Sequence, residues 1–227
     1  MAGFSLSRDA WVRIAPFALF MVLLALRGAA PADGTWGFDP RWLYALTVVT
    51  VGGLLLWWWR EYGELTRQTL PDRRETLLAI AVGLGVWALW IRLDAPWMTV
   101  GSPSAPFTPL SDDGIVDPTL VAMRWVGAAL VVPVMEELFC RSFLMRWLAQ
   151  PTFQGIEPAR VGVRAIVLST FVFTLAHNQW LAATIAGMAY ALLYVRSGKL
   201  WLAVIAHAVT NGALGIWVVA TGRWQFW

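Results

Sequence analysis

The feature that most restricts the fold of this chain is a succession of long apolar runs. The mean hydropathy is +0.61, and 59% of the residues are hydrophobic, which is far outside the range of a soluble globular domain. About 20 apolar residues cross the hydrocarbon core of a membrane as a helix. The sequence therefore predicts an all-α membrane protein, a polytopic bundle of about seven transmembrane helices, over residues 11–30, 42–59, 76–93, 119–145, 162–178, 181–196 and 199–221.

The positive charges between these runs predict the orientation. If the N-terminus is cytoplasmic, eleven of the 17 arginine and lysine residues fall on that side and four on the other, while Arg124 and Arg141 lie within the fourth run. Cytoplasmic loops carry the excess of positive charge. We therefore expect a multi-pass protein of the inner (cytoplasmic) cell membrane with its N-terminus in the cytoplasm. We expect the lipid bilayer to surround the protein. We interpret the net charge of +3 as a result of this topology and not as a sign of nucleic-acid binding.

A polar loop at residues 94–117, rich in proline, serine, glycine and aspartate, separates two parts of the chain. We expect residues 1–117 to supply three transmembrane helices and this outer loop. Residues 118–227 are expected to supply helices four to seven, in one integrated bundle with the first part. The loop is interpreted as a connector, with a flap that gates substrate as the alternative.

Three ionisable side chains fall inside the fourth run. A carboxylate at the centre of a spanning helix costs about 2.5–3.5 kcal/mol on insertion scales, so such residues are usually functional. Glu137 and Arg141 are four residues apart with the acid first, which favours an ion pair within the helix. Glu136 points about 100° away and needs a partner on another helix, as a catalytic carboxylate would. Pro133 is expected to kink the helix and to open the backbone beside Glu136.

The two histidines of the chain stand in two further polar motifs, Phe173-Thr-Leu-Ala-His177 and His207-Ala-Val-Thr-Asn211. A spacing of four places both ends of each motif on one helix face. Counted at about 1.5 Å per residue from the flanking charges, Glu136, the histidines and Asn211 reach similar depths near the middle of the bilayer. The sequence therefore predicts one buried, water-filled site between three late helices.

The single cysteine, Cys140, is the nearest candidate nucleophile to Glu136. The neighbouring carboxylates disfavour the thiolate that a nucleophilic cysteine requires. We therefore interpret Cys140 as a small residue that packs between helices.

In their order along the chain, the three motifs resemble those of the CPBP family of intramembrane glutamic endopeptidases. This family includes the type II CAAX prenyl proteases and the bacterial Abi-like proteins. The resemblance covers about residues 118–221, and Cys140 and Ser142 depart from the aromatic residue and the glycine that are common at those positions. Neither departure removes a catalytic group. The motifs are Glu136-Glu137-x-x-x-Arg141, Phe173-x-x-x-His177 and His207-x-x-x-Asn211.

The resemblance implies a division of roles among these residues. Glu136 and His177 would activate a water that attacks the peptide bond. His207 and Asn211 would stabilise the oxyanion that forms, and no cofactor or metal is implied. Three further residues would support the catalytic groups structurally: Glu137, Arg141 and Phe173.

Other functions fit parts of the same pattern. Glu136, His177 and His207 could instead be three ligands of a metal ion, although the helical His-Glu-x-x-His signature is absent. A proton-coupled membrane carrier or a non-catalytic binding or immunity protein are the alternatives from other classes. The alanine-, arginine- and tryptophan-rich composition indicates a bacterium, where prenylation is uncommon. We therefore expect the substrate to be a membrane-associated protein or peptide in protein sorting or peptide maturation.

Overall fold

The computed structural model describes residues 6–31, 35, 37–101, 107–111 and 113–227, so part of the predicted outer loop lies outside the described residues. In the described part, all the long elements are helices, which confirms the predicted all-α fold. Short 3₁₀ turns connect some of them. The α-helical segments are α1 (Arg8–Ala29), α2 (Trp42–Trp57), α3 (Arg73–Trp90), α4 (Pro118–Val126), α5 (Val132–Glu137), α6 (Arg146–Ala149), α7 (Val163–Leu175), α8 (Trp180–Ser197) and α9 (Leu200–Thr221).

Helices α4, α5 and α6 are parts of one continuous helix, Pro118–Ala149, which we call the central helix. Two π-helical segments join them, η5 (Gly127–Val131) and η6 (Leu138–Met145). Of the described helices, α1, the central helix and α9 are long and apolar enough to cross a membrane, and α2 and α7 are shorter apolar helices. Each of the seven predicted runs coincides with one helix when α4, α5 and α6 are counted together as the central helix, which corresponds to the fourth run.

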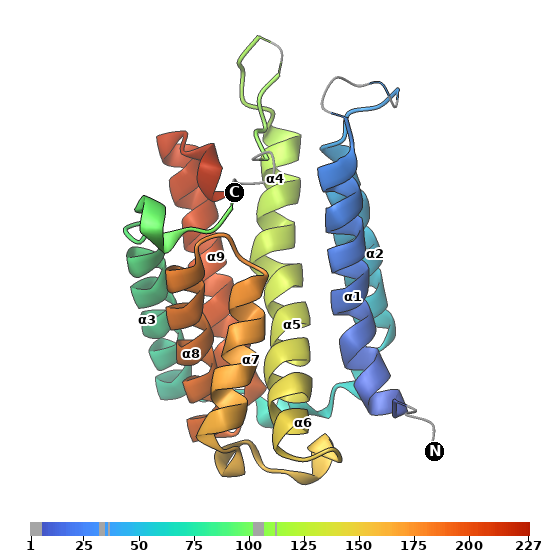
Figure 1. Ribbon diagram of the computed structural model, residues 1–227, viewed down its shortest axis with the longest axis vertical. Helices are drawn as coiled ribbons and strands as arrows, with labels where there is room; N and C mark the ends of the chain where they lie inside the picture. Colours follow the sequence, from blue (N-terminus) through green and yellow to red (C-terminus); the bar gives the residue numbers. More distant parts are fainter. Residues whose placement is uncertain (1–5, 32–34, 36, 102–106, 112) are drawn as a thin grey trace.

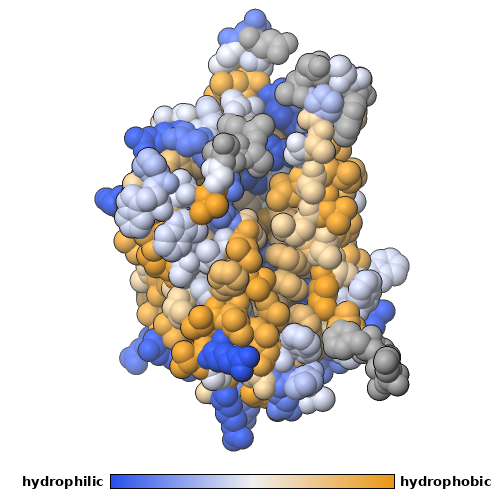
Figure 2. All heavy atoms as spheres, viewed as in Figure 1, coloured by the Kyte–Doolittle hydropathy of each residue, from blue (hydrophilic) through white to orange (hydrophobic). Residues whose placement is uncertain are grey.

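The helices run along one common direction, with α1 and α2 side by side and the central helix between them and the remaining helices (Figure 1). We call the end of the bundle that holds the start of α1 the N-terminal end, and the other the loop end. Apolar side chains cover much of the visible flank, and hydrophilic side chains gather toward the two ends (Figure 2). This distribution suits a bundle whose flank faces lipid.

Local sequence signals set where several of these helices begin and end. Asp72 and Glu75 form a capping box at the start of α3, each side chain bonding to the other residue's backbone N–H. Asp117 caps α4, and Pro118 occupies its first turn, where its missing N–H costs nothing. Helix α8 ends at Gly198, whose φ of 70° is left-handed and favours glycine.

Close contact between α3 and α9 fixes the position of the His207 motif. A side chain at Gly83 would place its first carbon 2.4 Å from the backbone oxygen of Ala206, so only glycine lets the two helices approach this closely. The hydroxyl of Thr210 also donates a hydrogen bond to the Gly83 oxygen at 2.9 Å. Helix α9 is thus held against α3 one turn beyond His207.

The fifth predicted run ends too late in the chain. Helix α7 ends at Leu175, so His177 lies in the turn that follows and not in the helix. The side chain of Gln179 donates hydrogen bonds to the Trp90 and Leu93 oxygens at the end of α3, at 3.1 and 3.3 Å. These tertiary contacts compete with further helical turns. The turn lies short of the loop-end tips of α4 and α9, inside the length of the bundle (Figure 1).

Candidate active site

The two glutamates of the central helix are both buried but have different partners. Glu137 is fully buried, and its Oε2 lies 3.1 Å from Nε of Arg141, so the predicted ion pair within the helix is present. Arg141 also donates from Nη2 to the Gly187 oxygen on α8 at 3.0 Å. Glu136 has no hydrogen-bond partner for its buried Oε2 among the described residues. Oε2 of Glu137 also lacks a hydrogen bond there, but Glu137 is ion-paired with Arg141, so Glu136 is the carboxylate available for chemistry.

His207 of α9 lies between the two carboxylates. Its Nδ1 is 2.9 Å from Oε1 of Glu137, and its Nε2 is 3.8 Å from Oε2 of Glu136. Because a carboxylate accepts, Nδ1 carries the proton of the first contact. The separation from Glu136 exceeds hydrogen-bond length. We call Glu136, Glu137, Arg141 and His207 the site cluster.

His177 is held by the end of its own helix. Its Nδ1 lies 2.8 Å from the Phe173 oxygen, and its ring centroid is 4.6 Å from that of Phe173 and 5.6 Å from that of Trp90. A carbonyl accepts only, so Nδ1 is the donor, and the neutral ring keeps an acceptor at Nε2. The Phe173–His177 motif thus fixes both the orientation and the tautomer of the histidine.

Asn211 is held by the backbone of the central helix. The N–H of Val132 donates to the Gly127 oxygen, five residues earlier, as in a π-helix. In that register the next donor would be Pro133, which has none, so the Ala128 oxygen needs another partner. Asn211 donates to it from Nδ2 at 2.9 Å. A π-helical segment therefore stands where we predicted a proline kink, and one amide hydrogen of Asn211 is left over.

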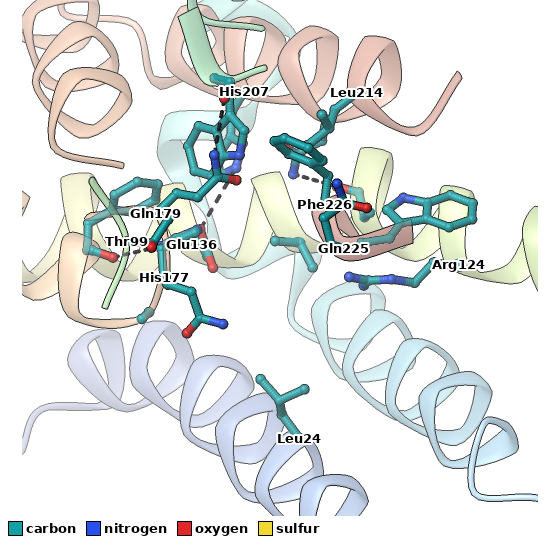
Figure 3. A pocket seen from close by; sticks show the side chains of 18 of the residues that line it. Leu24, Thr99, Arg124, Glu136, His177, Gln179, His207, Leu214, Gln225 and Phe226 are labelled. Atoms are coloured by element: carbon teal, nitrogen blue, oxygen red, sulfur yellow. Dashed lines mark hydrogen bonds and ion pairs between the residues drawn. The ribbon is translucent and has the colours of Figure 1, made fainter. Parts of the chain in front are cut away.

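A single cavity of about 520 Å³ unites the four predicted catalytic residues. Side chains from the central helix, from the α7–α8 turn and from α9 point into it (Figure 3). Each of the predicted motifs contributes to its wall, and Phe173 does so as well. The predicted catalytic residues that line the cavity are Glu136, His177, His207 and Asn211.

The sequence did not predict Tyr190 as a site residue. Its ring stacks on His207, with centroids 4.9 Å apart and planes 18° apart, and it lines the cavity. Its hydroxyl donates to Oγ1 of Thr210 at 2.8 Å. A polar aromatic residue in an apolar helix was the available signal, but the sequence does not show which neighbour such a residue faces.

Glu136, His177 and His207 were also considered as metal ligands. Within the described ranges, no three His, Cys, Asp or Glu side chains are grouped so that they could hold a metal ion. The metal alternative therefore gains no support from the positions of these side chains.

A second buried ionic group lies nearer the N-terminal end, and we call Arg13, Glu64 and Ser142 the anchor cluster. Arg13 donates to the two carboxylate oxygens of Glu64 at 2.8 and 2.6 Å and to Ser142 at 3.2 Å. The Ser142 hydroxyl also bonds to Glu64. Burial raises the pKa of Glu64, but the bonds from Arg13 and Ser142 outweigh this and hold the pKa below its ordinary value. These contacts tie α1 and the segment before α3 to the central helix.

An apolar helical bundle with a polar cavity is typical of an all-α membrane protein that carries an internal site. Residues 118–213 match the family model described as type II CAAX prenyl endopeptidase Rce1-like. The match confirms the resemblance inferred from the three motifs and indicates a membrane protease. Neither a curated protein nor a solved structure matches the chain.

Proposed function

We propose that this protein is an intramembrane endopeptidase of the glutamic type, which hydrolyses a peptide bond of a membrane-associated protein or peptide. The observation that carries the proposal is the Glu136 carboxylate, whose buried Oε2 has no hydrogen-bond partner among the described residues and which lines a cavity shared with two histidines and Asn211. An unpaired carboxylate inside a membrane bundle is costly, and function is the usual reason for keeping one.

The attacking water lies between Glu136 and His177. The carboxylate of Glu136 accepts one proton of the water, and Nε2 of His177, whose Nδ1 is bonded to the Phe173 oxygen, accepts a hydrogen bond from the other. The water oxygen then attacks the carbonyl carbon of the scissile amide. Both acceptors line the same cavity, which supports this assignment.

His207 and Asn211 stabilise the negative charge that develops on the carbonyl oxygen. The remaining amide hydrogen of Asn211 is one donor, because the other hydrogen is bonded to the Ala128 oxygen. His207 is the second donor through Nε2–H, as an imidazolium whose Nδ1–H is bonded to Glu137. Before the water attacks, Glu136, Glu137, Arg141 and His207 together carry no net charge. Once Glu136 has taken the proton, they carry one positive charge, which balances the oxyanion.

The tetrahedral intermediate then collapses. Glu136 passes the proton it took from the water to the amide nitrogen, the C–N bond breaks, and a carboxylic acid and an amine are released, which become carboxylate and ammonium in water. No covalent enzyme intermediate forms. Cys140 takes no part, since it is buried and is absent from the cavity wall.

The same proposal includes the biological setting. The protein lies in the inner membrane of a bacterium with its N-terminus in the cytoplasm, and its substrates are exported or sorted peptides. The charge asymmetry of the loops supports this orientation. A reporter fused after Trp227 should be active on the outer side, and cytoplasmic reporter activity would overturn the orientation.

The reaction is tested with purified enzyme and a membrane-associated peptide that it cleaves. Glu136→Gln keeps the shape of the side chain and removes the base, so turnover should be abolished while the melting temperature changes little. Cys140→Ala, the matched control on the same helix, should remain active. Wild-type turnover by Glu136→Gln would end the glutamic assignment. Inactivation by a strong chelator with recovery on adding zinc would replace it with a metalloprotease.

A further inference from the structure

The cavity holds one more positively charged side chain, at the end away from Glu136. Arg124 of α4 lines this end together with Gln225 and Phe226. Its guanidinium points into the cavity, with Glu136 and His177 on the far side (Figure 3). The proposed reaction makes no use of Arg124.

Arg124 has no carboxylate partner in the described part of the chain. Its buried Nε has no hydrogen-bond partner there either. Its guanidinium carbon lies over two aromatic rings, 4.5 Å from the Tyr44 centroid and 5.9 Å from the Phe107 centroid. Aromatic faces attract a cation but do not accept its hydrogen bonds as an oxyanion does.

A second arginine lies beside the first. The guanidinium carbon of Arg27, in the last turn of α1, is 5.1 Å from the same Phe107 ring. Among the described residues, Arg27 also lacks a carboxylate within ion-pair distance. Two like charges on one ring repel each other, and this repulsion is relieved when an anion binds between them.

A third polar group here has no partner. The Tyr44 side chain is buried, and its hydroxyl makes no hydrogen bond with the described residues. The hydroxyl lies against the central helix, since a first side-chain carbon at Gly127 would be only 2.6 Å from it. Buried polar groups are rarely left without partners, so these donors indicate a missing acceptor.

The buried arginines in the described ranges have polar partners within the protein. Arg13 pairs with Glu64, Arg141 pairs with Glu137, and Arg146 donates to the Ile156 oxygen and the Tyr194 hydroxyl. We propose that Arg124, with Arg27 beside it, binds a carboxylate of the substrate, on an acidic side chain or at its C-terminus. This inference rests on the proposed function, because it treats the cavity as the place of peptide cleavage. A lipid phosphate is the competing anion, but Arg124 lines the same cavity as Glu136 and belongs to the same central helix.

The spacing along the central helix sets where that carboxylate lies in the substrate. At about 1.5 Å per residue, positions 124 and 136 are about 18 Å apart. An extended peptide covers about 3.3 Å per residue. The carboxylate therefore lies about five residues from the scissile bond.

The test uses wild-type protein in neutral-lipid nanodiscs and a peptide that the protein cleaves. The peptide is synthesised as a series of pairs, with glutamate or glutamine at one position three to seven residues from the scissile bond, on either side of it. A second pair of peptides ends in a free acid or an amide. A carboxylate near the fifth position should raise kcat/KM about 10-fold or more, as a charge-assisted bond would. Arg124→Gln should remove this preference, while the exposed Arg92→Gln should keep it. Equal cleavage of all peptides by wild type would overturn the inference.

A binding measurement separates this inference from the proposed reaction. Fluorescence anisotropy with the Glu136→Gln protein should show tighter binding of the carboxylate peptides, and the added Arg124→Gln change should remove the difference. If binding shows this preference but wild type cleaves nothing, the site stands and the protease proposal fails. If Arg124→Gln changes only the retention of phosphatidylglycerol, the anion is a lipid phosphate and the inference is wrong.

Discussion

The site cluster and the anchor cluster share the central helix but differ in how completely their charges are paired. In the anchor cluster, Nη1 of Arg13 bonds to the Asp9 oxygen at 2.8 Å, and its other two nitrogens bond to Glu64. In the site cluster, Oε2 of Glu136, Oε2 of Glu137 and Nη1 of Arg141 have no hydrogen-bond partner among the described residues. One group of charges is saturated, and the other retains unused bonding capacity.

This difference separates charges that hold the bundle from charges that can react. A saturated buried ion pair has no atom left for a substrate. Removing one partner leaves the charge of the remaining partner unpaired in an apolar interior. An unsaturated carboxylate beside a cavity is costly by itself but can accept a proton. The contrast predicts that substitutions in the anchor cluster change stability alone, whereas substitutions in the site cluster also change turnover.

The largest effects are expected from the two buried arginines that pair with a glutamate. Arg13→Met and Arg141→Met each leave a buried glutamate without its partner, which should cost about 3–5 kcal/mol of unfolding free energy. The variants should differ in turnover per folded molecule. Arg13→Met should keep it, and Arg141→Met should lose much of it because Glu137 then no longer holds His207 in a fixed position.

These effects are measured as thermal unfolding in detergent together with turnover corrected for the folded fraction. Arg160→Met is the control, since the Arg160–Glu157 pair is exposed and such pairs contribute about 0–1 kcal/mol. An Arg141→Met protein as stable as wild type yet inactive would mean that Arg141 acts in the reaction and is not a support.

The next effect concerns the oxyanion. Asn211→Ala should lower kcat about 10²–10³-fold by removing one donor. It should also cost about 1–3 kcal/mol of stability, because the Ala128 oxygen loses its partner. Ser142→Ala, which removes a hydroxyl from the anchor cluster, should leave kcat unchanged. An Asn211→Ala enzyme with normal kcat and reduced stability would show that Asn211 only supports the backbone of the central helix and does not stabilise the oxyanion.

The sequence was sufficient to predict Glu136, His177, His207 and Asn211 as neighbours. Polar groups in apolar helices are costly, so their depths along the helices indicated a common site. It was not sufficient to predict that Glu137 also binds His207. Helical spacing pairs Glu137 with Arg141, and it contains no information about which face of α9 packs against the central helix.

The anchor cluster could not be predicted from the sequence for a related reason. Arg13, Glu64 and Ser142 come from three distant segments, and Glu64 lies in a connecting segment, η2 (Gly63–Leu65), that hydropathy does not describe. The π-helical segments and the early end of α7 are also set by tertiary contacts. Periodicity in a single sequence predicts the existence of helices better than their ends.

A smaller effect is expected at Tyr190. Tyr190→Phe removes the hydrogen bond to Thr210 but keeps the ring against His207, so it should cost about 0.5–1.5 kcal/mol of stability and change kcat less than about 10-fold. Tyr190→Ala also removes the stacked ring and should lower kcat further. Equal kcat for the two variants would show that the stacking does not position His207.

The smallest effect is the response of the anchor cluster to acid. The pKa of Glu64 is lower in the folded protein than its ordinary value of 4.5, so the unfolded chain binds more protons as the pH falls. The stabilisation is complete above about pH 4.5 and is lost as the pH falls through the folded pKa. Glu64→Gln removes this titration and keeps the size of the side chain. Between pH 7 and pH 4, the melting temperature of wild type should therefore fall by a few degrees more than that of Glu64→Gln. Other carboxylates titrate in both proteins and cancel in the comparison, so parallel curves would show that Glu64 is not held ionised by Arg13 and Ser142.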